Sequence, residues 1–381
     1  MIVREIDQSS KKDVRKWIRF PYKIYRGNKL WVPPFIAGAK KQLDREKHSF
    51  YKSGGDAAFF VVEKEGKIIA RVGVINNKRL NMGLKDTKAQ FNWFEAYKDK
   101  EAVEMLFDAA FDWCRQQGLT YVQGPKSLIE GDSAGILVKG FEHRPAVNVS
   151  YNFDYYSDLI ESVGFKKDHD MLSGFVDIAK VQRPPERVVR IAEMIKKRRG
   201  FSIMEFKSKK ELWAVAEDIK NVHQAAFANE GQRIMTDEQF MQTAKELIFL
   251  SDPKLIKLVM KDDKIIGFLF TYPDITKGIK RSGGRMGLIG ILNILIEKKL
   301  TKWINVNGVG ILPEYQGLGA NAILYHELAK TLMESKYKYA DAVFVSEFNY
   351  RSFSDNESMG VNWYKAHRIY RIELFEYLLE V

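Results

Sequence analysis

The same order of strand-like and helix-like segments occurs twice along the 381 residues of this chain. In the first half, one strand pattern and one helix pattern precede an alternating hairpin pattern at 57–76, and further strand and helix patterns follow as far as residue 178. In the second half, the corresponding hairpin pattern lies at 255–271. Two similar halves explain this repetition more simply than one large irregular domain. The sequence therefore predicts a two-domain α+β (α/β) protein.

The basic composition restricts the class of partner. The chain has 61 Lys and Arg against 49 Asp and Glu, a formal net charge of +12, which favours an anionic partner. A nucleic acid, a phosphate-bearing cofactor and an anionic membrane surface all fit. Basic residues are spread along the chain without a recognised reading motif, so nucleic acid is the weakest of these expectations.

Cysteine and histidine usage excludes several kinds of site. Cys114 is the only cysteine, which excludes an intramolecular disulfide and a zinc site built on several cysteines. None of the six histidines has metal-ligand spacing, so we expect no metal. The longest apolar stretch, 286–296, is shorter than the roughly 20 residues that span a membrane, and no signal peptide pattern is present. We expect a cytoplasmic protein without a transmembrane segment.

The most informative stretch is a glycine-containing turn between a strand pattern at 303–311 and a helix pattern. It reads Pro-Glu-Tyr-Gln-Gly-Leu-Gly at 313–319. Such a turn directs several backbone N–H groups to one place, where the helix dipole also favours an anion. It is neither a nucleotide P-loop nor a dinucleotide fingerprint, because the lysine and the third glycine are missing. The alternative is a tight turn that needs glycine for steric reasons alone.

These residues resemble the acetyl-CoA loop of the GCN5-related N-acetyltransferase (GNAT) superfamily, and the resemblance extends over about 201–380. It implies that turn amides hold the pyrophosphate of acetyl-CoA or of another acyl-CoA. The superfamily has Gly or Ala where this chain has Asn321, whose side chain would crowd a phosphate. The implied cofactor-binding residues of the turn are Gln316, Gly317, Leu318, Gly319, Ala320 and Asn321.

The strand before the turn contains Gly308 and Gly310. A glycine inside a strand indicates a bulge or a close approach of another backbone, and tight packing under a helix is the alternative. The resemblance implies that this strand and the next one splay apart and that the pantetheine pairs with the freed backbone. We therefore add Gly310 and Ile311 to the cofactor-binding residues and expect one of their N–H groups to stabilise the oxyanion.

Acyl transfer to an amine also needs a base and an acid. Counting by twos along the strand pattern at 339–347 places Val343, Val345 and Glu347 on one face, so Glu347 is the candidate base. A solvated acid at a strand end is the alternative reading of Glu347.

The acid and the pantetheine contact come from the end of the chain. Superfamily members often place a tyrosine four residues before the glycine that ends the last helix, where this chain has Asn356. Tyr364 is the candidate acid instead, with Tyr315 as a second choice. We expect Asn349 to cap the following helix and to face the pantetheine.

The first half keeps the order of elements without the phosphate loop. Between 94 and 103 it has no glycine and three carboxylates, Glu95, Asp99 and Glu101, which would repel a pyrophosphate. We therefore predict a degenerate GNAT-like domain at 1–180, a linker with a basic helix at 181–200, and a GNAT domain with the cofactor loop at 201–381. Each domain is expected to be a mixed, mostly antiparallel sheet flanked by helices, and the whole chain resembles a group of bacterial acetyltransferase-like proteins.

Residues 274–300 have no counterpart in a minimal acetyltransferase. Basic residues precede an apolar run at 288–296, and Lys298, Lys299 and Lys302 follow it. The segment 277–302 fits a peripheral membrane-surface helix, a lid over an apolar acceptor, or a core helix that covers the sheet.

The favoured function is transfer of an acetyl or other acyl group from coenzyme A to an amine of a small molecule or peptide. One alternative is a non-catalytic CoA-binding or sensor protein of the same fold. Another is an aminoacyl-tRNA-dependent (Fem-like) transferase, since those enzymes share the tandem architecture. Neither the acceptor nor the oligomeric state follows from the sequence.

Overall fold

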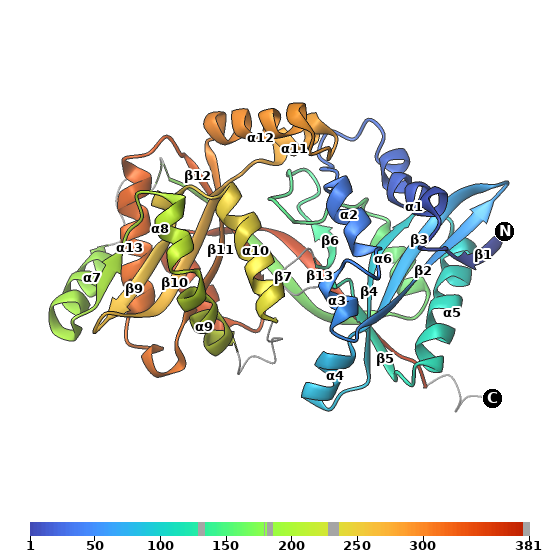
Figure 1. Ribbon diagram of the computed structural model, residues 1–381, viewed down its shortest axis with the longest axis horizontal. Coiled ribbons are helices and arrows are strands. Elements are labelled where there is room, and N and C mark those ends of the chain that lie inside the picture. Colours follow the sequence, from blue (N-terminus) through green and yellow to red (C-terminus); the bar gives the residue numbers. More distant parts are fainter. Residues whose placement is uncertain (129–133, 179, 181–185, 228–235, 376–381) are drawn as a thin grey trace. The chain divides into compact units, whose positions relative to one another are not determined.

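The computed structural model describes residues 1–128, 134–178, 180, 186–227 and 236–375, and the chain forms two compact units (Figure 1). Unit 1 consists of Met1–Met171, Thr276–Leu295 and Lys365–Val381, and unit 2 of Leu172–Ile275 and Ile296–Tyr364. The units thus interleave along the chain, and no single cut separates them. The boundary at 181–200 stays a prediction of where one copy of the fold ends and the next begins.

The sheet of unit 1 is built around the predicted hairpin. β2 (Asp56–Lys64) and β3 (Lys67–Asn76) are joined by Glu65 and Gly66, whose φ angles of 52° and 72° suit a tight hairpin turn. β1 (Ile2–Glu5) pairs antiparallel with β2, and β4 (Lys88–Ala96) pairs antiparallel with β3. β5 (Tyr121–Gly124) runs parallel to β4. The predicted mixed, mostly antiparallel sheet is confirmed.

Helices cover both faces of this sheet, because neighbouring strand residues point to opposite sides. Phe59 and Val61 of β2 pack with Trp17 of α1 (Lys11–Ile24). Phe60 and Val62 pack instead on α5 (Lys100–Gln116), whose buried residues are spaced by three or four positions. The remaining described elements of this part of the chain are α2 (Ile36–Gln42), α3 (Ser49–Lys52), α4 (Lys78–Leu84), β6 (Ile136–Lys139) and α6 (Tyr156–Ser162).

Unit 2 repeats the same strand order. Its antiparallel neighbours are β8 (Ser202–Met204), β9 (Lys257–Lys261), β10 (Lys264–Pro273) and β11 (Trp303–Ile311), and β12 (Tyr339–Ser346) runs parallel to β11. Both units therefore have four antiparallel strands followed by one parallel strand.

The two faces of the unit 2 sheet also have separate cores. Leu258 and Phe268 pack against α8 (Lys209–Ala214), α9 (Ala216–Phe227) and α10 (Asp237–Leu250). Val259 and Leu269, one residue further along their strands, pack with α13 (Ala320–Met333) and α7 (Glu186–Arg199). Val215 ends α8 and separates it from α9. α14 (Tyr350–Ser358) follows β12, and the short 3-10 helix η2 (Pro253–Leu255) precedes β9.

Each unit receives its last strand from the other half of the sequence. β13 (Asn362–Glu373) is the final strand of the chain, and its end pairs antiparallel with β5, with Tyr370 opposite Gly124. Tyr370 and Leu374 are buried in the core of unit 1. β7 (Lys166–Asp177), the last strand of the first half, is the neighbour of β12, and the Ile178 N–H donates to the Lys338 carbonyl at 2.8 Å. The two copies of the fold have exchanged their closing strands.

The segment 274–300 forms two helices, α11 (Thr276–Ser282) and α12 (Leu288–Leu300). α12 buries Ile294 and Glu297 but leaves Leu288 90% and Ile289 77% exposed. The alternative of a core helix that covers the sheet with its apolar run is therefore wrong, because most of that run faces outward. Among the described residues, no helix has the length and apolar character needed to cross a membrane.

Candidate active site

The strands β11 and β12 separate halfway along their length. Their parallel pairing runs from Trp303 opposite Tyr339 to Val306 opposite Ala342, and within the described chain the pairs end there. Both strands continue, β11 to Ile311 and β12 to Ser346. The splay that the resemblance implied is present.

A bulge accompanies the splay. Leu269 of β10 is opposite Val309, but Thr271 is opposite Val306, so β11 holds one extra residue between these pairs. Gly308 lies there with φ 128°, a conformation that is almost exclusive to glycine. At Gly310 an added Cβ would come within 2.6 Å of the Phe268 ring. The predicted bulge is present at Gly308. At Gly310 the close neighbours are side chains, the Phe268 ring and Ala226 of α9, so the alternative of tight packing applies there.

The backbone of β11 beyond the bulge has one free edge. The Leu312 N–H donates to the Ile266 carbonyl at 2.9 Å, on the side of β10. N–H groups of successive strand residues point to opposite edges, so the Gly310 N–H also faces β10, whereas those of Val309 and Ile311 face the open side. The Ile311 carbonyl on that side accepts from Gln316 Nε2 at 3.2 Å. This alternation favours Ile311 over Gly310 as an amide donor to a ligand.

The turn after β11 leaves a group of amides without a protein partner. A 3-10 helix, η3 (Pro313–Tyr315), leads into the turn, and α13 begins with Gly319 as its N-cap and no side-chain cap. The N–H groups of Gln316 and Leu318 donate to backbone carbonyls. Within the described chain, no protein acceptor is present for the N–H groups of Gly317, Gly319, Ala320 and Asn321. Together with the helix dipole they form an anion cradle.

Glycine is required in this turn for two different reasons. Gly317 and Gly319 have φ angles of 73° and 89°, in the left-handed region. Around Gly317 the space is open, whereas a Cβ on Gly319 would overlap the Ile195 side chain of α7. Gly319 is thus also a packing position, and a substitution there would disturb α7 as well as the cradle.

Asn321, which departs from the superfamily pattern, does not point into the cradle. Its Nδ2 donates to the Asp355 carboxylate of α14 at 2.9 Å. The side chain therefore connects α13 to α14, and its backbone N–H stays available. The crowding expected from an asparagine at this position is not present.

Glu347 is half-buried and directly follows β12, which ends at Ser346. The alternation that was used to predict its direction does not hold, because Phe344 has φ 55° and interrupts the regular strand. Asn349 caps α14 as predicted, since its side chain accepts from the Ser352 N–H at 3.0 Å. Its contact with a pantetheine stays a prediction.

Tyr364 lies in β13, and its hydroxyl donates to Asp341 Oδ2 at 2.9 Å. Asp341 belongs to β12 and is the partner of Asn305 in β11, one residue before the last pair of the two strands. Tyr315, the second choice, packs its ring edge-to-face on Phe201. Asn356 is buried and donates to the Ser352 carbonyl at 2.7 Å, so it closes a turn of its own helix.

The sequence reasoning missed a buried polar cluster beside the splay. Asn305 Nδ2 donates to Asp274 Oδ2 at 3.3 Å, and Asn307 Nδ2 donates to the Tyr272 hydroxyl at 2.9 Å. Burial raises the pKa of Tyr272 above its ordinary value, which keeps the hydroxyl protonated. The available signal was the alternation of two asparagines, Asn305 and Asn307, in an otherwise apolar strand. Their partners lie on other strands and could not be found by local spacing.

The corresponding place in unit 1 has the bulge without the cradle. β4 holds one extra residue opposite Arg71–Gly73, and Trp93 has φ 54° there. The Asp99 carboxylate accepts from the Ala102 N–H and occupies the N-terminus of α5. Glu95 is partly buried and accepts hydrogen bonds of 2.8 Å from the hydroxyls of Tyr25 and Tyr156. Glu95 and Asp99 are therefore structural, and Asp99 stands where an anion would bind.

Sequence comparisons find two distant relatives that cover nearly the whole chain. No family model matches the chain. It is 23% identical over 376 residues to protein YghO of Escherichia coli, with 96% of this chain and 94% of that protein covered. It is 22% identical over 368 residues to a bacterial ceramide synthase of Caulobacter vibrioides, with 94% of each chain covered.

Solved structures with the same fold cover nearly the whole chain. A tandem GNAT protein from the clavulanic acid biosynthesis pathway matches 98% of both chains with a TM-score of 0.56 and 9% identity. A GCN5-related N-acetyltransferase from Sphaerobacter thermophilus matches 98% of this chain and 95% of that one, with a TM-score of 0.51 and 13% identity. The chain has the tandem fold of GCN5-related N-acetyltransferases, as the turn at 313–319 led us to expect.

Proposed function

We propose that this chain is an acyl-CoA-dependent N-acyltransferase whose cofactor site lies in unit 2. The observation that carries the proposal is the cradle of N–H groups at Gly317, Gly319, Ala320 and Asn321, next to the open edge of β11. Two neighbouring sets of backbone donors suit a ligand with a pyrophosphate followed by an amide-containing chain. Asn321 leaves this cradle open because its side chain is held by Asp355.

The residues around the splay supply the groups that amide formation needs. A bound acyl-CoA supplies a thioester carbonyl for attack by an amine. The Ile311 N–H, on the open edge of β11, donates to the negative charge that develops on the carbonyl oxygen. Tyr364 is the acid for the leaving thiolate. Its single hydroxyl proton is donated to Asp341 in this structure, so the hydroxyl must turn away from Asp341 to protonate the thiolate. Glu347, at the end of β12, accepts the proton of the attacking amine.

A lipid amine is the acceptor class with specific support. The Caulobacter relative is named a bacterial ceramide synthase and is covered over 94% of its length. A ceramide is the amide of a long-chain amino alcohol and a fatty acid, so its formation is an N-acylation. The exposed apolar face of α12 fits a substrate that resides in or near lipid. A small-molecule or peptide amine is the alternative acceptor.

Isothermal titration calorimetry with acetyl-CoA and with a long-chain acyl-CoA tests the cofactor proposal. The variant Gly317→Asp adds a carboxylate to the cradle, where the space around Gly317 is open. We expect binding to weaken by at least about tenfold, because the added charge opposes the pyrophosphate. Gly66→Asp is the matched control, with φ 72° against 73°, open space and the same added charge in the hairpin turn of unit 1.

The possible outcomes distinguish cofactor binding from catalysis. Absence of heat with both acyl-CoA compounds, or equal binding by Gly317→Asp and wild type, contradicts the proposal. Binding without free-thiol release, across polyamines, amino acids, peptides and a long-chain amino alcohol, favours the non-catalytic sensor instead. Strong salt-dependent tRNA binding without CoA binding favours the aminoacyl-tRNA-dependent transferase.

A further inference from the structure

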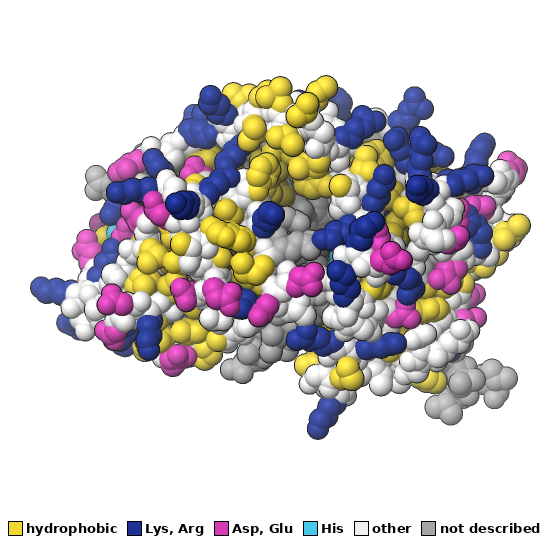
Figure 2. Space-filling model, in the orientation of Figure 1, with side chains coloured by type: hydrophobic (Ala, Val, Ile, Leu, Met, Phe, Trp, Pro, Cys, Tyr) yellow, Lys and Arg dark blue, Asp and Glu magenta, His cyan; other side chains and the backbone are white. Residues whose placement is uncertain are grey.

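We propose that the exposed face of α12 docks on an anionic lipid membrane. The proposal goes beyond the acyltransferase function and does not depend on it, because it rests on the surface of one helix. Figure 2 shows hydrophobic side chains gathered over α12, with Lys and Arg side chains on either side.

The exposed side chains of α12 form one stripe that is apolar except for Lys299. Residues spaced by three or four positions share one side of a helix, and the exposed members of α12 follow this spacing. The opposite side, with Gly290, Ile294 and Glu297, is buried. An ordinary surface helix has its apolar side inward and its polar side outward, so α12 is reversed. The exposed stripe consists of Leu288, Ile289, Leu292, Leu295, Ile296 and Leu300.

The charges around this stripe are of one sign. Between 276 and 302 the single acidic residue, Glu297, is buried, so every exposed charged side chain is basic. Lys280 and Lys298 are used within the fold, where their Nζ atoms donate to the carbonyls of Asn28 and Ser251. Arg281 is exposed but also donates to the Asn293 carbonyl at 3.3 Å. The exposed cations are Lys277, Arg281, Arg285, Lys299 and Lys302.

An anionic membrane is the partner whose chemistry matches both features. A helix lying in the membrane interface buries apolar side chains at the acyl boundary while basic residues contact anionic headgroups. The 13 residues of α12 are about 20 Å long, which suits a helix lying on the surface rather than one that crosses the bilayer. Lys299 lies within the apolar stripe, and its long side chain can extend to the headgroups.

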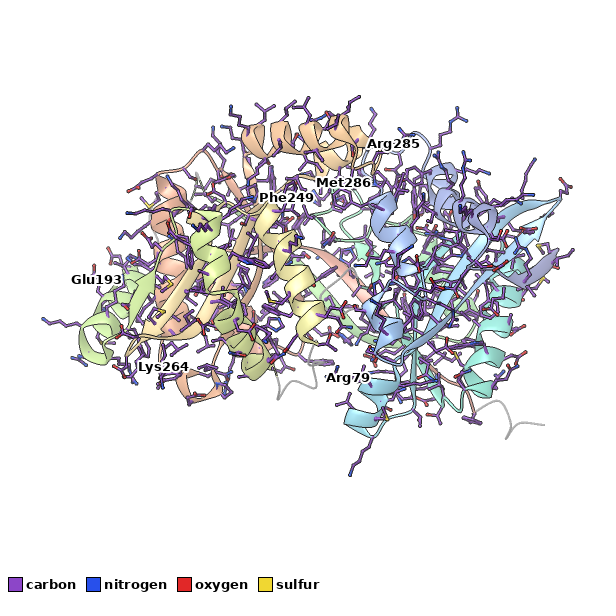
Figure 3. The ribbon with its side chains drawn as sticks, viewed as in Figure 1. Arg79, Glu193, Phe249, Lys264, Arg285 and Met286 are labelled. Atoms are coloured by element: carbon purple, nitrogen blue, oxygen red, sulfur yellow. The ribbon has the colours of Figure 1, made fainter. Side chains whose placement is uncertain are left out.

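The start of this segment is anchored, so the stripe is presented by a fixed support. The Ile36 N–H donates to the Gly284 carbonyl at 2.9 Å, and the Tyr22 hydroxyl donates to the Gly283 carbonyl at 3.2 Å. An added Cβ on Gly284 would overlap the Pro34 carbonyl oxygen. Arg285 and Met286, labelled in Figure 3, follow directly and are both exposed.

Flotation of the full chain with vesicles tests the proposal. Vesicles of phosphatidylcholine are compared with vesicles that contain about a third phosphatidylglycerol, at low and at high ionic strength. We expect flotation with the anionic vesicles, and weaker flotation with neutral vesicles or in high salt. Leu288→Glu with Leu292→Glu should reduce partitioning by roughly tenfold or more, because two apolar contacts become acidic. The matched control is Met82→Glu with Leu84→Glu, an exposed apolar pair on α4 that undergoes the same change of charge.

A second pair of variants tests the charges. Arg285→Glu with Lys299→Glu should weaken flotation with anionic vesicles by about tenfold and remove most of its salt dependence. Arg79→Glu with Lys264→Glu changes the net charge equally at exposed positions on other elements (Figure 3) and should leave flotation unchanged. All substituted side chains are exposed, and thermal unfolding checks that the variants keep their fold.

Three results would overturn the proposal. The first is wild-type protein that does not float with anionic vesicles. The second is flotation that the α12 variants leave unchanged or that their controls reduce equally. The third is a stable oligomer, measured by analytical ultracentrifugation, that Leu288→Glu with Leu292→Glu dissociates while vesicles are not bound, since a second copy of the chain would then cover the stripe.

Discussion

Two buried histidines of unit 1 are held in the neutral form. Burial lowers the pKa of both His48 and His367 to about 4. His48 Nδ1 accepts from the Phe50 N–H at 3.2 Å, which only an unprotonated nitrogen can do. Histidines in the unfolded chain have a pKa near 6.5, so below that pH the unfolded state takes up more protons than the folded state. The two neutral histidines therefore make their full contribution to the free energy of unfolding above about pH 6.5. This contribution is lost as the pH falls towards 4.

His48→Asn should therefore reduce the acid sensitivity of unit 1. Asparagine can still cap the helix that begins at Ser49 but does not titrate. Between pH 7.5 and pH 5 the variant should lose about 2 kcal/mol less free energy of unfolding than the wild type. Urea unfolding at both pH values measures the difference. His143→Asn, at a half-exposed position, is the control, and an equal change in both variants would contradict the argument.

At the scale of single residues, the sequence predicted backbone roles better than side-chain directions. The sequence showed that glycine is needed at 308, 310, 317 and 319, because a glycine inside a strand or tight turn indicates either a positive φ angle or a neighbour too close for a Cβ. The direction of the Glu347 side chain could not be predicted in this way, because the prediction assumed a regular strand and Phe344 interrupts that strand. Local spacing could not predict the hydrogen bonds of Asn321 and Asp341 either. Asn321 pairs with Asp355, 34 residues further along the chain, and Asp341 pairs with Tyr364, 23 residues further along.

At the scale of elements, β11 combines a bulge with a free edge. The extra residue at Gly308 changes the alternation of the strand just where β12 departs. The sequence predicted this strand with its observed bounds, and the hairpins before it to within a few residues, because alternation and turn residues are local. The exposure of α12 was left open, because an apolar run with basic flanks fits a membrane-surface helix, a lid or a core helix.

Gly308→Ala should affect both stability and cofactor binding. A φ of 128° is unfavourable for alanine, and the expected loss of stability is roughly 1–3 kcal/mol. If β11 relieves this strain by losing its bulge, acyl-CoA should bind several-fold more weakly. Urea unfolding and calorimetry measure the two effects. Gly27→Ala, with φ 84° and open space, should destabilise without changing binding. A destabilised Gly308→Ala with wild-type affinity would show that the bulge does not serve the cofactor.

At the scale of the whole molecule, the exchanged strands connect the two copies of the fold. Repetition of elements predicted two similar halves, but each last strand could pair with either half, and only tertiary packing decides between them. The end of β13 supplies Tyr370 and Leu374 to the core of unit 1. Unit 1 is therefore incomplete in any fragment made from the first half of the sequence alone.

A chain ending at residue 364 should lose the folded unit 1 although residues 1–171 are unchanged. It lacks the strand that pairs with β5, which leaves an unpaired edge and opens the hydrophobic core. Limited proteolysis should then cleave unit 1 rapidly, and its thermal transition should disappear. A chain ending at residue 375 keeps the strand and should behave as the full chain does. Retention of a protected unit 1 in the shorter chain would contradict this prediction.

The exchange of closing strands also determines when unit 1 can fold during synthesis on the ribosome. Residues 1–171 emerge first, yet the sheet of unit 1 cannot close until residues 365–374 have left the exit tunnel. The edge of β5 in the nascent first half therefore stays uncovered while residues 172–364 are being translated. Throughout this interval the edge of β5 is an unpaired strand edge, the kind of surface to which other strands bind.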